Sequence, residues 1–262
     1  MNINLTGKRA LVCGGSRGLG LASAKELASL GAEIILLSRT ESKLQIALEE
    51  INPLNNLSNS IIPCDVSDID ALKKSIKNEI AANGPIHILI NNSGGPAAGL
   101  IQDATPDQFL AAFNAHIIAS HTLAKLLIPG MKADHYGRII NMVSTSVRQP
   151  ISGLGVSNTI RGSMASWSKT LSAELAPSGI TVNNILPGAT NTERLEEIWE
   201  KRQQMFNQSL EEVKADMVAE VPMNRFADPE EIAAAVAFLA SPAASYITGV
   251  SLPVDGGKIK SI

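Results

Sequence analysis

The sequence contains few aromatic residues and no excess of charge of one sign. Phe, Trp and Tyr make up 3% of its 262 residues, whereas 45% of the residues are hydrophobic. The core must therefore be mainly aliphatic, as in a parallel sheet that helices cover on both faces. Because 22 basic and 25 acidic residues give a net charge of −3, the chain lacks the basic stripe expected of a nucleic-acid binder.

Long apolar runs, an export signal and cysteine clusters are also lacking. Apolar runs such as Ile34–Leu37 and Ile86–Ile90 are far too short to cross a bilayer. The N-terminal residues do not have the basic-then-apolar order of a signal peptide. The two cysteines, Cys13 and Cys64, fall in predicted strand ends, where small buried thiols are expected rather than a disulfide or metal site. We therefore expect a cytoplasmic protein without a membrane partner or a metal.

Short β-rich runs alternate with longer helical patterns along the chain, which favours right-handed βαβ units. We predict an α/β fold with one domain, 1–262, built on a single doubly wound, Rossmann-type parallel sheet of about seven strands with helices on both faces. The predicted strands are Arg9–Cys13, Glu33–Ser38, Ser60–Cys64, Ile86–Asn91, Arg138–Ser144, Thr181–Leu186 and Val250–Pro253. The predicted helices are Leu19–Leu30, Glu41–Ile51, Ile69–Ala82, Pro106–Met131, Ser157–Leu175 and Pro229–Leu239.

One charged helical segment, Thr192–Glu220, lies between the sixth predicted strand and the last helix. It is either a solvated helical insertion or a mobile lid over a substrate pocket. We favour the lid, at about residues 192–220, because of where the segment falls relative to the strand ends.

A glycine-rich turn joins the first predicted strand to the first predicted helix. Glycines let the backbone approach a diphosphate closely, and the free N–H groups of a helix N-terminus favour an anion. Because a strand precedes the turn and a helix follows it, we predict a dinucleotide site rather than a turn without a ligand. The residues assigned to this site are Gly14, Ser16, Arg17, Gly18, Leu19 and Gly20.

The position that distinguishes the two nicotinamide dinucleotides carries no acid. An acidic residue about 20 positions after the glycines would hold the ribose 2′-hydroxyl of NAD. Here Ser38 occupies that position, Arg39 follows it, and Arg17 lies in the glycine turn. Two guanidinium groups and a hydroxyl suit a 2′-phosphate, so we predict a preference for NADP(H) over NAD(H). The alternative is that both arginines are ordinary surface residues.

The spacing Gly14-x-x-x-Gly18-x-Gly20 resembles that of the short-chain dehydrogenase/reductase family, and further motifs follow in the family's order. The resemblance of each motif implies a role in binding the cofactor. Asp65 and Val66 would contact the adenine, and Asn91, Ser93 and Gly94 would form the turn after the fourth strand. The nicotinamide would be cradled by Pro187, Gly188, Thr190 and Thr192. Gly137–Asn141 resembles the start of the family's fifth strand. The stretches 224–232 and 247–257 are similar to the C-terminal region of its 3-oxoacyl-(acyl-carrier-protein) reductases.

The sequence departs from this family at the catalytic residues, which are usually an Asn, a Ser and a Tyr-x-x-x-Lys pair. Ser144 matches the serine, but Ser157 stands at the tyrosine position and Arg161 at the lysine position. His116 stands at the asparagine position, although Asn114 is only two residues away. The chain has two tyrosines, Tyr136 and Tyr246, and neither is near this motif in sequence. Ser144–Val147, Ser157-Asn158 and Arg161 together resemble a divergent branch of the same family, whose members are known only as oxidoreductases.

These substitutions change the chemistry that can be expected. A serine is a much weaker acid than a tyrosine, and an arginine keeps its proton. His116 is the best remaining acid, since a free imidazole has a pKa of about 6.5. We therefore hypothesise that Ser144 and Ser157 hydrogen-bond the substrate oxygen, Arg161 supplies positive charge, and His116 delivers a proton directly or through water. The alternatives are a structural His116 bonded to the backbone and a Ser157 that caps its helix.

The function favoured by the sequence is an NADP(H)-dependent reductase or dehydrogenase of a carbonyl or alcohol. The resemblance implies a 3-oxoacyl thioester as one possible substrate and a homo-oligomer, tetramer or dimer, packed through the helices Pro106–Met131 and Ser157–Leu175. We expect the pocket between Ser144–Ser157, the Gly94–Leu100 loop and the predicted lid. Two alternatives remain open: a catalytically silent dinucleotide-binding sensor or scaffold, and a non-redox enzyme on the same fold.

Overall fold

Seven parallel strands form one sheet in the order β3-β2-β1-β4-β5-β6-β7 in the computed structural model, which describes residues 1–261. The predicted α/β fold with a doubly wound parallel sheet is confirmed. The strands are β1 (Arg9–Cys13), β2 (Glu33–Ser38), β3 (Ser60–Pro63), β4 (Ile88–Asn91), β5 (Gly137–Met142), β6 (Ile180–Pro187) and β7 (Ser251–Val254). The strand order reverses between β1 and β4, which places a ligand crevice at their carboxyl ends.

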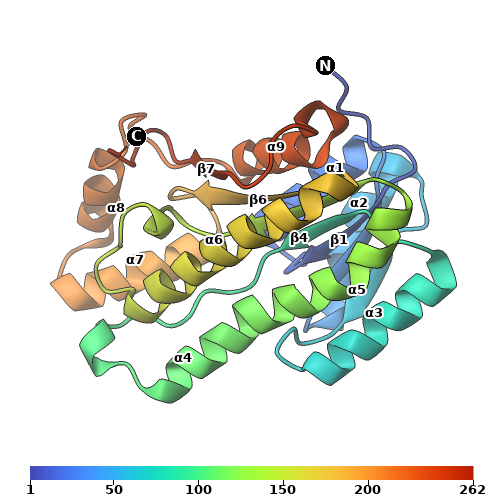
Figure 1. Ribbon diagram of the computed structural model, residues 1–262. Coiled ribbons are helices and arrows are strands. Elements are labelled where there is room, and N and C mark those ends of the chain that lie inside the picture. The colour runs from blue at the N-terminus through green and yellow to red at the C-terminus, as the bar shows by residue number, and fades with distance from the viewer. Residues whose placement is uncertain (262) are drawn as a thin grey trace.

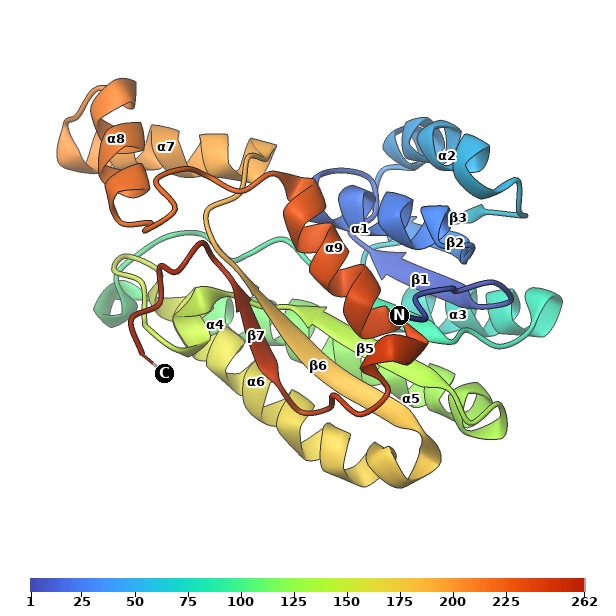
Figure 2. The same cartoon turned by 90° about the horizontal axis from the view of Figure 1, so that it is seen from above.

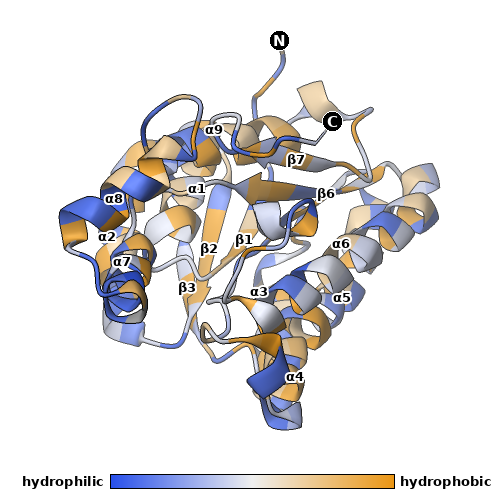
Figure 3. Cartoon of the chain, turned by 90° about the vertical axis from the view of Figure 1, so that its left-hand side faces the viewer, coloured by the Kyte–Doolittle hydropathy of each residue, from blue (hydrophilic) through white to orange (hydrophobic). Residues whose placement is uncertain are grey.

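The strands are apolar on both faces because both faces are buried. Along β1, Ala10 and Val12 pack into one cluster and Leu11 and Cys13 into the other. Figure 3 shows the hydrophobic strands lying between helices of mixed hydropathy. This pattern is the expected result of helices covering both sides of a parallel sheet.

Two groups of helices cover the two faces of the sheet (Figures 1 and 2). One face packs against α1 (Gly18–Ser29), α2 (Glu41–Asn55) and α9 (Pro229–Ala240). The other packs against α3 (Ile69–Asn83), α5 (Ala119–Ala133) and α6 (Gly155–Leu175). Within residues 1–261, no helix combines the length and the apolar character needed to span a bilayer.

The prediction of one continuous helix over Pro106–Met131 is wrong, because a wider turn interrupts it. The structure has α4 (Pro106–Phe113), a π-helical turn at Asn114–Ile118, and then α5. Thr105 begins α4 with a capping box to Gln108. The wide turn holds one more residue per turn than an α-helix, and such turns are frequent at functional sites. It contains His116, which is 3% exposed.

The charged segment after β6 forms two helices, α7 (Glu193–Phe206) and α8 (Leu210–Ala219). Leu195, Val213 and Met217 are buried between them in a small cluster of their own. Figure 2 shows both helices beyond the arrowhead ends of the strands, on the side where the crevice lies. That these helices move as a lid stays a prediction.

Candidate active site

The glycine turn is a backbone cradle that side chains would fill. Gly14 and Gly18 have φ angles of 60° and 54°, in the left-handed region that glycine tolerates. A Cβ on Gly20 would lie 2.2 Å from the Gly14 carbonyl oxygen, and one on Gly14 would lie 2.6 Å from the Asn92 carbonyl oxygen. The close approach of β1, α1 and the chain after β4 therefore depends on glycine at both positions.

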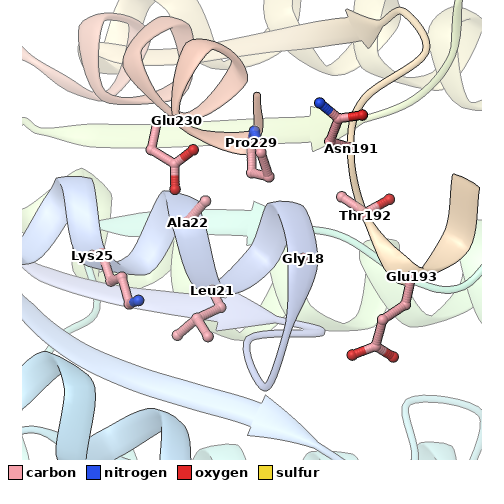
Figure 4. A pocket seen from close by; sticks show the side chains of 9 residues that line it. All are labelled: Gly18, Leu21, Ala22, Lys25, Asn191, Thr192, Glu193, Pro229 and Glu230. Atoms are coloured by element: carbon pink, nitrogen blue, oxygen red, sulfur yellow. The ribbon is translucent and has the colours of Figure 1, made fainter. Parts of the chain in front are cut away.

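The N-terminus of α1 can accept an anion. Arg17 caps the helix in an extended conformation, without a side-chain hydrogen bond to the first turn, and that turn contains no acidic residue. A cavity of about 250 Å³ lies beside it, between the start of α1 and the segment Asn191–Glu193 (Figure 4). Thr192 is close to Gly18, since its methyl carbon would lie 3.7 Å from a Cβ there. The cradle therefore fits a dinucleotide diphosphate.

The predicted 2′-phosphate residues lie in different environments. The Ser38 hydroxyl at the end of β2 is buried and has no hydrogen-bond partner among the described residues. The Arg39 side chain is 79% exposed, and its Nη1 is 3.9 Å from Asp65 Oδ2. Arg17 instead forms an ion pair with Glu193 at the start of α7. An unsatisfied hydroxyl beside an exposed guanidinium suits a ribose or its phosphate, whereas Arg17 would have to leave Glu193 to contribute.

Asp65 and Val66 follow β3 at the same edge of the sheet. The Asp65 carboxylate accepts hydrogen bonds from the Ser67 hydroxyl at 2.7 Å and from the Ser67 amide at 2.9 Å. These bonds lower the pKa of Asp65, and the charge of Arg39 acts in the same direction. Asp65 is therefore ionised and can accept a hydrogen bond.

The segment after β6 is ordered by its own hydroxyl groups. Thr190 donates to the Gly188 carbonyl at 3.1 Å, and Thr192 donates to the Thr190 carbonyl at 3.3 Å. A Cβ on Gly188 would lie 2.7 Å from Asp255 Cα, so Gly188, next to Pro187, lets the end of the chain pass close by. These contacts hold the segment between the glycine turn and α7.

Asn91 does not point into the crevice. Its amide donates to Asn141 Oδ1 at 2.7 Å, inside the sheet. Asn141 in turn donates to Ser168 Oγ at 2.9 Å and to Asn184 Oδ1 at 3.0 Å, and the Asn184 amide donates to Ser251 Oγ at 3.0 Å. This chain of buried polar groups, which links β4 to β7 and α6, was not predicted from the sequence.

His116 is bonded to Ser93, a residue predicted only as part of the cofactor turn. Ser93 Oγ and His116 Nδ1 are 2.7 Å apart. Burial lowers the pKa of His116 to about 3, the positive charge of Arg161 acts in the same direction, and a hydrogen bond to the Gly94 backbone opposes both. The imidazole is therefore neutral near pH 7. Asn114, the alternative at this position, is exposed.

Arg161 extends from α6 toward the end of β5. Its Nη1 donates to the Met142 carbonyl at 2.8 Å. Burial and the charge of Arg194 lower its pKa to about 10, so the guanidinium is still protonated at neutral pH. No carboxylate of residues 1–261 lies within ion-pair distance of it.

The two candidate serines lie at the starts of helical segments. Ser144 follows β5 rather than ending it, and its hydroxyl accepts a hydrogen bond from the Ser146 amide at 3.1 Å. Leu154 is the N-cap of α6, so Ser157 is the third helical residue, and its alternative role as a cap is wrong. Both serines are partly exposed.

A second cavity, of about 550 Å³, lies between α4 and the chain that follows β4. His116 and the loop Gly94–Leu100 line it, as do Val156 and small residues of α4. Ser144, Ser157 and Arg161 are not among its lining residues, so these three do not form its walls as the sequence suggested. Within residues 1–261, no three His, Cys, Asp or Glu side chains are grouped closely enough to hold a metal ion.

Comparison with known proteins decides the family. Residues 14–258 match the family model described as enoyl-(acyl carrier protein) reductase. The chain is also 33% identical, over 255 residues, to the 3-oxoacyl-(acyl-carrier-protein) reductase FabG of Vibrio cholerae, an alignment covering 97% of this chain and 98% of the relative. The chain belongs to the short-chain dehydrogenase/reductase family.

Solved structures agree with this assignment. The L-sorbose reductase of Gluconobacter frateurii, in complex with NADPH and L-sorbose, has a TM-score of 0.94 and 29% identity, and the match covers 100% of both chains. NAD⁺-bound xylitol dehydrogenase has a TM-score of 0.91 and 29% identity, covering 97% of this chain and 99% of that one. This short-chain dehydrogenase/reductase is therefore an NAD(P)-dependent oxidoreductase of carbonyl or alcohol substrates.

Neither tyrosine of this short-chain dehydrogenase/reductase is near the crevice. Tyr136 precedes β5, at the amino end of the strand, and its hydroxyl donates to the Ala240 carbonyl at 2.6 Å. Tyr246 precedes β7 and is fully exposed. Since the crevice lies at the carboxyl ends of the strands, neither phenol lies where it could act on a ligand there.

One cation beside Gly95, Arg194 in the first turn of α7, was not predicted from the sequence. A Cβ on Gly95 would lie 3.7 Å from Arg194 Nη2 and 3.8 Å from Arg161 Nη2. Arg194 also approaches the Pro96 carbonyl, at 3.5 Å. The two arginines are 33 positions apart in sequence. Only the position of Arg194 in the charged segment between the sixth strand and the last helix could have pointed to it.

Proposed function

We propose that this chain is an NADP(H)-dependent reductase or dehydrogenase whose active site uses the Ser93–His116 pair and Arg161 in place of the tyrosine and lysine usual in its family. The observation that carries the proposal is the joint position of these three residues. The pair, the guanidinium and the glycine cradle all lie at the carboxyl ends of β1, β4 and β5, where this fold binds its ligands.

The cofactor would supply or accept a hydride at its nicotinamide ring. Its diphosphate would lie on the amides of the glycine turn, at Gly18–Gly20, and its ribose and adenine near Ser38 and Asp65. The segment Pro187–Thr192 and the Gly94 turn would hold the nicotinamide half.

The residues around the substrate oxygen would stabilise negative charge that develops on it. Ser144 and Ser157 present hydroxyl groups from the ends of two neighbouring segments. Arg161 contributes a fixed positive charge, which a partly buried site makes more effective than it would be in water. Because an arginine does not release its proton readily, its role would be electrostatic.

His116 would act as a neutral hydrogen-bonding group. With a pKa of about 3, the imidazolium is too scarce near neutral pH to be the proton source. In the tautomer whose Nδ1 accepts from Ser93, Nε2–H can donate a hydrogen bond to the substrate oxygen, or to a water molecule that gives that oxygen its proton. A neutral imidazole is able to polarise a carbonyl in this way. The hypothesis that His116 delivers a proton is therefore narrowed. His116 remains a hydrogen-bond donor to the substrate oxygen or to a water molecule, but in its neutral form.

Similarity to the FabG reductase supports a 3-oxoacyl thioester as a substrate to test first, and similarity to L-sorbose reductase supports polyol and sugar ketones. The test is NADPH consumption with a panel of 3-oxoacyl thioesters, ketoses and simple ketones. We expect turnover that falls at least tenfold in His116→Asn and in Arg161→Gln, and that stays unchanged in Tyr246→Phe.

The same assay separates the alternatives. NADPH binding without consumption of any substrate would favour the silent sensor or scaffold, which the absence of a tyrosine near the crevice also favours. Substrate conversion without cofactor oxidation would indicate a non-redox enzyme. Full activity of both His116→Asn and Arg161→Gln would contradict the proposed catalytic roles.

A further inference from the structure

Two guanidinium groups from different elements flank one point beside Gly95. Arg161 extends from α6 and Arg194 from α7, and the Nη2 atoms of both come within 3.8 Å of the position that a Gly95 Cβ would occupy. Because residue 95 is a glycine, no side chain fills the space between the two cations.

Of the two cations, Arg194 has a carboxylate partner within residues 1–261 and Arg161 does not. Arg194 Nη1 forms an ion pair with Glu197 at 2.6 Å, which leaves Nη2 directed toward Gly95 and Pro96. Arg161 makes one hydrogen bond, to the Met142 carbonyl, and has no carboxylate partner among the described residues. A partly buried cation without a counter-ion is costly, and a bound anion would remove that cost.

We propose that the substrate carries a carboxylate, held between Arg161 and Arg194 beside Gly95. This inference rests on the proposed oxidoreductase function and specifies its substrate class, namely oxo acids or hydroxy acids. A guanidinium fork matches the two oxygens of a carboxylate, and the mutual repulsion of two arginines ends when an anion bridges them. Since Arg194 belongs to α7, the anion would also link the charged helical segment 192–220 to the floor of the site.

The first experiment measures binding alone. Protein saturated with NADPH is titrated calorimetrically with hexanoate and with hexanamide, which has the same chain but no charge. NADPH is present so that its phosphates cannot be confused with the anion under test. The variants are Arg194→Gln and, as matched control, Lys201→Gln, which removes an exposed positive charge from the same helix.

We expect hexanoate to bind at least about tenfold more tightly than hexanamide, and Arg194→Gln to remove about tenfold of the hexanoate affinity while leaving hexanamide unchanged. Lys201→Gln should change neither affinity. Equal binding of the two probes would overturn the proposal. So would equal effects of the two substitutions, because α7 would then act only through its general charge.

The second experiment measures turnover with 2-hexanone, 2-oxohexanoate and 5-oxohexanoate. The two acids are the same ketone with a carboxylate in place of one or the other terminal methyl group. We expect at least one acid to have a kcat/KM about tenfold or more above that of 2-hexanone, and Arg194→Gln to remove this preference.

These experiments distinguish the inference from the function on which it rests. Reduction of all three compounds with equal kcat/KM would overturn the carboxylate site and leave the reductase standing. Hexanoate binding that depends on Arg194, without NADPH consumption by any ketone, would support the anion site and contradict the redox function.

Discussion

Gly20→Ala tests the glycine cradle directly. The new methyl group would lie 2.2 Å from the Gly14 carbonyl oxygen, 2.7 Å from the Gly14 carbonyl carbon and 2.8 Å from Asn92 Nδ2. Two of these three atoms belong to the backbone, so no rotamer change can relieve the contact. The turn itself must move, which should cost about 1–3 kcal/mol in the free energy of unfolding.

The chain offers a matched control in Gly162→Ala. Gly162 is also helical, but it is exposed on α6, and a Cβ there would meet nothing within 4 Å. Alanine in a helix interior is more favourable than glycine by about 0.5–1 kcal/mol, so this variant should be slightly more stable than the parent protein. The same substitution of glycine by alanine should therefore lower the free energy of unfolding at position 20 and raise it at position 162.

Two measurements check this prediction. Urea denaturation of the protein without cofactor gives the free energy of unfolding, and an unchanged m value shows that the unfolded state is comparable. Fluorescence titration gives the NADPH dissociation constant, which should rise at least tenfold in Gly20→Ala because the amides of the turn are displaced, and should stay unchanged in Gly162→Ala. A Gly20→Ala variant that matches Gly162→Ala in both measurements would refute the cradle.

Three further predictions concern charge and assembly. Arg39→Gln should weaken NADPH binding about tenfold and leave NADH binding unchanged in parallel titrations; equal losses would exclude a 2′-phosphate contact. Burial lowers the His116 pKa from 6.5 to about 3, so the unfolded chain takes up this proton first, and the stability that is complete above pH 6.5 is lost as the pH falls toward 3. Between about pH 7 and pH 5, urea denaturation should therefore show a loss of stability that is roughly 2 kcal/mol smaller in His116→Asn and unchanged in His121→Asn, an exposed control. Finally, Leu110 on α4 is 60% exposed, and we expect a tetramer or dimer by light scattering that Leu110→Arg shifts to smaller species; a monomeric parent protein would exclude this assembly.

The fold could be predicted closely because its signals are local. The bounds of β1 and β2 are those predicted from their apolar runs, and the glycine turn follows from residues adjacent in sequence. The predicted ends of other strands differ from the observed ones. Ser144 lies beyond β5, because its hydroxyl accepts a hydrogen bond from the amide of residue 146, and this bond begins a helical turn.

The site could be predicted only in part because its contacts are not local. Ser93 and His116 are 23 positions apart, and no pattern in the sequence indicates that their side chains form a hydrogen bond. The neutrality of His116 depends on burial and on Arg161, which only the tertiary structure reveals. Ser168 on α6 is buried and bonded to Asn141 and Asn184, contacts between distant parts of the chain that no local pattern indicates.

The wide turn at Asn114–Ile118 has a consequence for how this region tolerates change in length. Each residue of an α-helix advances the chain by about 100° around the axis. In an uninterrupted α-helix, one inserted residue would therefore turn everything downstream by that angle, and Leu123, Leu127 and Met131, now at most 1% exposed, would face away from the sheet. The wide turn absorbs one additional residue, so the second half of the helix keeps its apolar side toward the sheet. Deleting one residue from the turn should therefore restore an ordinary α-helix and leave that packing intact, while it displaces the imidazole beside the crevice.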